Sequence, residues 1–204
     1  MIKALLLIFD AAATWERISQ AQRRVGFILV FFLLPLLGFT SAVEGFGLVR
    51  WGKPRGEVSW MKRFSVSEAA VFEGAQVVLW LLIIFVSAKV LKSMCETFHG
   101  QRNYTSAFAT VAYGLSPLFL VHLLDVFPAV SPWMTWGLGI ILSIAVLYHG
   151  VPRMMEPDPP HAFGLYLMSA LTVFLATGLL RFVTAWYLQG EFGKLETLLR
   201  GLNP

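Results

Sequence analysis

The fold of this chain is decided by the stretch Ser106–Phe127, which reads SAFATVAYGLSPLFLVHLLDVF. Most of it lies within a run of 22 residues between Arg102 and Asp125 that carries no formal charge. A helix needs about 20 mostly apolar residues to cross the hydrocarbon core of a bilayer, which is about 30 Å thick. The stretch therefore predicts a membrane-spanning helix.

Four further charge-free runs accompany it, and three of them are long enough to span a bilayer. They contain 19, 15, 27 and 22 residues, and lie between Arg24 and Glu44, Glu73 and Lys89, Asp125 and Arg153, and Asp158 and Arg181. The short second run can extend toward Lys92, because the side chain of Lys89 can reach the membrane surface. The predicted spans are Val25–Val43, Ala70–Lys92, Ser106–Phe127, Trp133–Val151 and His161–Tyr187.

The composition favours the same class of protein. Hydrophobic residues make up 57% of the 204 residues, charged residues make up 14%, and the mean hydropathy is +0.68. A soluble helical bundle would need more polar surface than this chain supplies. We predict an all-α polytopic membrane protein, a bundle of five transmembrane helices preceded by an N-terminal amphipathic interfacial helix.

Residues 1–24 are expected to form that amphipathic segment, followed by a transmembrane domain over residues 25–187 and a short polar tail over residues 188–204. The alternative of a cleaved signal peptide is disfavoured, because Asp10 interrupts an apolar stretch that covers only Ala4–Phe9. The apolar residues expected on one face of the interfacial helix are Ile2, Leu5, Phe9, Trp15 and Ile18.

Three local signals mark the ends of the spans. Ser65 and Glu68 have the spacing of a capping box at the start of the second helix. Pro128 and Pro132 enclose a short link, which predicts an antiparallel hairpin of the third and fourth helices. The segment Glu156–Pro160 predicts a stiff polar turn before the fifth helix.

The charges and the single cysteine limit the partners and cofactors. The net charge of +4 is scattered over the loops, which favours contact with anionic lipid headgroups over binding to nucleic acid. With Cys95 alone, the chain can form neither an internal disulfide nor a cysteine-based zinc site, and we expect no cofactor. The basic residues divide eight and eight between the two sides, so they do not determine the orientation.

Five polar residues are predicted to lie on the same side of the membrane when the helices are threaded up and down: Glu44, Glu73, His122, Asp125 and Arg181. Such a cluster could serve as a proton relay, a cation site, an anion clamp or a metal site. The simpler interpretation is one structural ion pair between Asp125 and Arg181, with the other three residues reaching interfacial water. We favour the ion pair, and we expect no catalytic residues, because no nucleophile–base pair or known catalytic motif is found.

With five spans placed, several motifs point to a family. They are Ile8-Phe9 followed by Thr14–Ile18, Phe98–Gly100 with Tyr104 and Ala107–Leu118, and Leu147–Pro152. In order and spacing these segments resemble the Yip family, the Ypt/Rab-GTPase-interacting membrane proteins, and in particular its bacterial branch. The resemblance implies a five-helix protein with the N-terminus inside and the C-terminus outside, and without enzymatic activity.

The sequence departs from the family in two places. Ala11–Ala13 stands where the lead-in usually has a proline, and the long N-terminal region through which eukaryotic members engage Rab GTPases is missing, so we do not expect Rab binding. The expected function is the organisation of the bilayer or of partner proteins in a bacterial inner membrane. The expected partners are the lipid bilayer and other membrane proteins or copies of the chain. The alternative is a small transporter or channel that uses the polar cluster.

Overall fold

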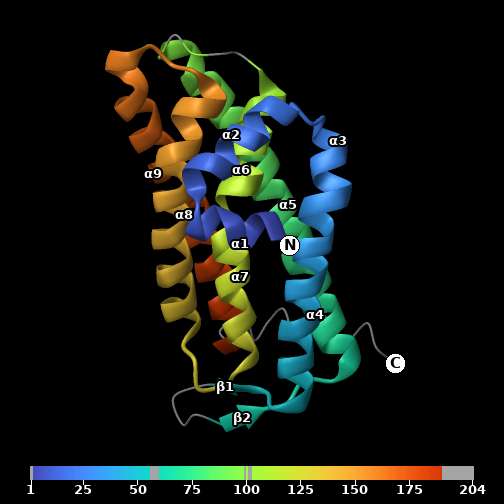
Figure 1. Cartoon of the computed structure of the whole chain (residues 1–204). Helices are drawn as coiled ribbons and strands as arrows, with labels where there is room; N and C mark the ends of the chain where they lie inside the picture. The colour runs from blue at the N-terminus through green and yellow to red at the C-terminus, as the bar shows by residue number, and fades with distance from the viewer. Residues whose placement is uncertain (1, 56–59, 99, 101–102, 190–204) are drawn as a thin grey trace.

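Five long apolar helices dominate the computed structural model, which describes residues 2–55, 60–98, 100 and 103–189 (Figure 1). They extend over Val25–Arg50, Val66–Thr97, Tyr104–Val126, Pro132–Met155 and Pro159–Leu188. Each is long and apolar enough to cross a membrane. The predicted all-α fold is confirmed. The first, second and fourth helices run several residues past their predicted ends, because a charged residue ends an apolar run without ending a helix.

The first span contains an irregular turn near its start. It consists of α3 (Val25–Ile28), the π-helical turn η1 (Leu29–Leu33) and α4 (Leu34–Arg50). Pro35 lies two residues after this turn, and its ring and missing N–H disfavour the regular hydrogen-bond pattern of an α-helix just before it.

The second span, α5 (Val66–Thr97), begins at the predicted capping box. The amide of Glu68 donates to Ser65 Oγ over 3.1 Å, and the amide of Ser65 donates to Glu68 Oε2 over 2.8 Å. The amides of Ser65 and Glu68 both have hydrogen-bond acceptors, as the Ser65–Glu68 spacing predicts.

The third span lies at the centre of the bundle. In its most apolar stretch 83% of the residues are buried, against 33–44% in the other four spans. It is divided into α6 (Tyr104–Gly114), α7 (Ser116–His122) and the 3₁₀ turn η2 (Leu123–Val126). The break falls at Leu115, two residues before Pro117. Beside it, Ser116 Oγ donates to the carbonyl of Tyr113 over 2.6 Å and Ser143 Oγ accepts from the amide of Leu118 over 3.3 Å. Side-chain hydroxyls thus occupy backbone groups beside the break.

The fourth and fifth spans flank the central helix. Helix α8 (Pro132–Met155) packs against α7 and against α9 (Ala162–Gln189), which follows the 3₁₀ turn η3 (Pro159–His161). Gly139 allows the close approach to α7, since a Cβ there would lie 2.6 Å from Leu118 Cδ1. The third and fourth helices form the hairpin that the prolines around the short link predict.

A short β-hairpin joins the first two spans, where the sequence predicted no strand. Strands β1 (Lys53–Arg55) and β2 (Trp60–Lys62) are antiparallel, with Lys53 opposite Lys62. Gly52, with a φ of 77°, leads into it, and a Cβ at this position would overlap the carbonyl of Lys62. The hairpin lies at the same end of the bundle as the link between α7 and α8 (Figure 1).

The N-terminal segment forms two helices. They are α1 (Ile2–Phe9) and α2 (Ala11–Ala21), separated by Asp10, which caps α2 by accepting from the amide of Ala13 over 3.3 Å. Helix α2 packs on α8, and α1 lies across the bundle about halfway along its length and contacts α7 (Figure 1). The single apolar face that the sequence predicted is therefore split between two helices.

The two helices also differ in which side chains they bury. Trp15 and Ile18 of α2 are buried in the bundle, whereas Leu5 and Phe9 of α1 are exposed, Phe9 by 85%. Asp10 accounts for the difference, because its cap restarts the helix and changes the direction of the chain.

Candidate functional site

The centre of the polar cluster is an ion pair between the third and fifth spans. Asp125, in η2, accepts a hydrogen bond at Oδ2 from Arg181 Nη2 of α9 over 2.6 Å. Their side chains are 1% and 3% exposed. A buried charge is costly unless it is paired and hydrogen-bonded, so each residue depends on the other. The structure thus brings together the two residues that the sequence analysis paired.

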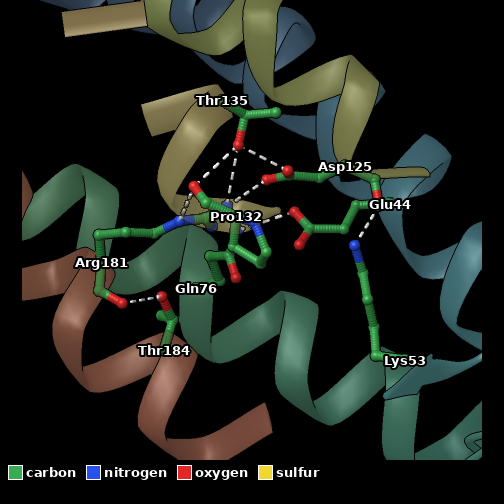
Figure 2. A network of polar contacts seen from close by, with 8 residues as sticks. All are labelled: Glu44, Lys53, Gln76, Asp125, Pro132, Thr135, Arg181 and Thr184. Atoms are coloured by element: carbon green, nitrogen blue, oxygen red, sulfur yellow. Dashed lines mark hydrogen bonds and ion pairs between the residues drawn. The ribbon is translucent and has the colours of Figure 1, made fainter. Parts of the chain in front are cut away.

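Residues of helix α8 form further hydrogen bonds with both members of this ion pair (Figure 2). Arg181 Nε donates to the carbonyl of Pro132 over 2.9 Å, and Nη2 also donates to Thr135 Oγ1 over 3.2 Å. Thr135 Oγ1 lies 2.7 Å from Asp125 Oδ1 and donates to it. We call Asp125, Pro132, Thr135 and Arg181 the clasp, because they connect one end of the third, fourth and fifth spans.

Lys53 joins the clasp from outside the spans. Its Nζ donates to the backbone carbonyl of Asp125 over 2.6 Å, and its side chain is buried. Burial lowers the pKa of Lys53 from its ordinary value, while the nearby negative charges of Asp125 and Glu44 act in the opposite direction. The β-hairpin therefore places a lysine against the end of the third span.

A second group of polar side chains lies between the first two spans. Glu44 of α4 accepts at Oε2 from Gln76 Nε2 of α5 over 3.0 Å, and both residues are buried (Figure 2). Glu73 lies one turn before Gln76 and packs on Gly45, where a Cβ would come within 3.3 Å of Glu73 Cγ.

Two of the five predicted residues have buried atoms without a hydrogen bond in the described part of the chain. They are Glu73, at both carboxylate oxygens, and His122, at Nε2. The His122 ring lies 5.5 Å from the ring of Trp80. The expectation that Glu44, Glu73 and His122 reach interfacial water differs from the structure, because all three are at most 7% exposed. The spans continue past these residues and enclose them.

Sequence reasoning missed three participants. Gln76 could have been found, because it is a polar residue within a span and lies three positions after Glu73. Thr135 and Lys53 gave no signal. Threonines are common in helices that span membranes, and the place of Lys53 depends on a hairpin that no pattern predicted. As for a metal, no three His, Cys, Asp or Glu side chains within residues 2–55, 60–98, 100 and 103–189 are placed to hold one.

Comparison with protein families identifies the chain. The family model described as the Yip1 domain matches residues 5–191. The chain belongs to the Yip1 family. A search of the curated proteins and a search of the solved structures each gave no match. The Yip1 match includes all five spans and most of α1 and α2, so this is a multi-pass membrane protein whose N-terminal helices lie largely within the family domain.

Three of the segments on which the resemblance to the Yip family rests, Thr14–Ile18, Ala107–Leu118 and Leu147–Pro152, meet at one side chain. Trp15 Nε1 of α2 donates to the carbonyl of Val146 in α8 over 3.0 Å. A Cβ on Gly150 would lie 2.5 Å from the Trp15 ring, and the Tyr113 ring packs edge-on to it at 6.4 Å. The lead-in, the third helix and the end of the fourth helix of this Yip1 domain are therefore joined at Trp15.

Proposed function

We propose that the protein is a non-enzymatic membrane protein that organises the bilayer around it. The observation that carries the proposal is the position of α1, which packs on α7, and of α2, which packs on α8: both lie in the half of the bundle opposite to the β-hairpin (Figure 1). Helices that lie between one end of the bundle and its middle take more area in that half of a bilayer than in the other. Such a wedge favours curved or loosely packed membrane, as amphipathic interfacial helices do.

The side chains of α1 support this role. Leu5, Leu6 and Phe9 are 49%, 39% and 85% exposed, on a helix whose other face holds Ala4 and Leu7 against the bundle. Each exposed side chain contributes up to about 1.5–3 kcal/mol when it moves from water into an apolar environment. The exposed apolar side chains of α1 are therefore available to contact lipid. Trp15 attaches the neighbouring helix α2 to the bundle.

The clasp supports the absence of catalytic activity. Asp125 and Arg181, the two residues best suited to acid–base or anion chemistry, are committed to contacts among three helices. We further propose that the N-terminus faces the cytoplasm of a bacterial inner membrane, and that the exposed apolar faces of the spans contact lipid, other membrane proteins or further copies of the chain. The orientation of the N-terminus and the bacterial inner membrane are taken from the family resemblance.

Vesicle shape tests the proposal. The full chain is reconstituted into liposomes at rising protein-to-lipid ratios, and vesicle diameters are measured by electron cryomicroscopy. We expect smaller or tubular vesicles with the wild-type chain and a weaker effect with the double variant Leu5→Ser/Phe9→Ser. The matched control is Leu171→Ser/Leu175→Ser, which changes two exposed leucines on α9. Equal diameters for the wild type and the α1 variant would contradict the proposal.

The unpaired groups favour transport as the second candidate function. Buried Glu73 and His122 atoms without hydrogen bonds are typical of sites that take up a proton or an ion. Proton flux into vesicles, followed with an interior pH dye, separates the two functions. A flux that Glu73→Gln abolishes, and that Glu96→Gln on the exposed end of the same helix leaves intact, would establish the transporter. Our proposal predicts no flux.

A further inference from the structure

A basic cavity lies at the end of the bundle opposite to the clasp. Its volume is about 220 Å³, and it lies among the end of α2, the link to α3, the start of α6 and the end of α8. Four basic residues line it, Lys3, Arg23, Arg24 and Arg153, together with one acidic residue, Glu156. The excess of positive charge favours an anion.

Contacts with neighbouring side chains and with one backbone carbonyl hold three of these cations in place. Arg153 Nη1 donates to the carbonyl of Ala12 over 2.7 Å and to Glu16 Oε2 over 3.0 Å. The Arg23 guanidinium lies 4.7 Å from the centroid of the Phe27 ring, and Lys3 Nζ lies 5.9 Å from that of Tyr113. These cations therefore lie on several walls of the same cavity.

The mouth of the cavity lies at the depth expected for lipid headgroups. Three spans have their ends here, at Val25, Tyr104 and Met155. Thr105 and Ser106 line the cavity at the first turn of α6, where the helix dipole is positive. Deeper along the spans, the walls become apolar at Ile28 and Ala109.

Lys3 places a further cation in the deeper part of the cavity. It lies beside Tyr113, nine residues beyond Tyr104 in the third span, which is about 14 Å along a helix. An ammonium group at this depth is costly unless water or a counter-ion reaches it. The cavity gives such access, because it is lined both by Lys3 and by the arginines at its mouth.

We propose that this cavity binds the phosphate of an anionic phospholipid, with Arg23, Arg24 and Arg153 around the headgroup and the acyl chains along the apolar side chains. The site would attach α1 and α2 to one leaflet. It does not depend on the vesicle-shaping role, because a lipid can bind here whether or not the membrane curves.

Native mass spectrometry of the full chain in mild detergent tests the site. Phosphatidylglycerol, phosphatidylcholine and inorganic phosphate are titrated separately. We expect one tight phosphatidylglycerol per chain, much weaker phosphatidylcholine binding and no effect of inorganic phosphate. The variant Arg23→Gln/Arg24→Gln should bind phosphatidylglycerol about 30-fold more weakly, which is about 1 kcal/mol per arginine.

The matched control is Lys89→Gln/Lys92→Gln, which removes two charges from α5 outside the cavity walls. Its phosphatidylglycerol affinity should stay within twofold of the wild type. An equal loss in both variants, or none in the arginine variant, would overturn the proposal. Tight binding of inorganic phosphate that displaces phosphatidylglycerol would assign the cavity to a soluble anion instead. Circular dichroism and gel filtration of each variant show that a lost affinity is not a lost fold.

Discussion

The clasp gives the most direct prediction, because the substitution Asp125→Asn leaves Arg181 buried without its counter-charge. The Arg181 side chain is only 3% exposed, and its bonds to Pro132 and Thr135 do not neutralise it. Removing one partner of a buried ion pair typically costs about 3–5 kcal/mol. We expect Asp125→Asn to lower the free energy of unfolding by about 3 kcal/mol, since two neutral acceptors remain for the guanidinium.

A double-mutant cycle measures the coupling. Unfolding is followed by circular dichroism as dodecyl sulfate is titrated into mixed micelles, for the two single variants and for Asp125→Asn/Arg181→Gln. The double variant should lose about 1–3 kcal/mol less than the sum of the singles, because it removes the stranded charge. The exposed pair of Glu16 and Arg153 is the control, and Glu16→Gln should cost less than about 1 kcal/mol. Strictly additive losses would refute the view that Asp125 and Arg181 act as a unit.

Three further predictions concern the N-terminal helices, the buried lysine and the topology. Gly150→Leu should displace Trp15 and lower the free energy of unfolding by about 1–3 kcal/mol, whereas Gly137→Ala, where a Cβ meets nothing within 4 Å, should not lower it. Burial lowers the pKa of Lys53 in the folded protein, so the unfolded chain binds more protons than the folded chain below the ordinary lysine pKa. The free energy of unfolding should therefore rise with pH up to about 10.5, and Lys53→Met should remove this rise. Reporter fusions before α1 and after α9 should report opposite sides of the membrane, and the same side for both would contradict five spans.

The five spans, and the depth that Asp125 and Arg181 of the clasp share, could be predicted from the sequence. Charge-free runs locate the helices, and alternate threading places Asp125 and Arg181 at the same depth. The pattern could not show that Thr135 and Lys53 take part, because both contacts depend on how neighbouring elements are packed. Threading fixes the depth of each residue and leaves the facing of each helix open, so the pairing of Asp125 with Arg181 was a preference based on depth alone.

The N-terminal segment shows a second limit of sequence analysis. Amphipathicity predicted a helix at the membrane surface, and an apolar face looks the same whether it meets lipid or protein. What holds α2 on the bundle is Gly150, more than a hundred residues away, which leaves room for the ring of Trp15. A missing side chain carries no hydrophobic signal, so this contact is found only in three dimensions.

The clasp also bears on the order in which the protein is made. Arg181 follows Asp125 by 56 residues, so at about 5–20 residues per second the ribosome supplies the partner about 3–11 s after the acid. During that interval the fourth span is inserted while Asp125 has no guanidinium to pair with. A chain that stalls or is cut before α9 keeps this carboxyl group unpaired, and such an exposed intramembrane acid would let quality-control proteases distinguish an incomplete chain from a finished one.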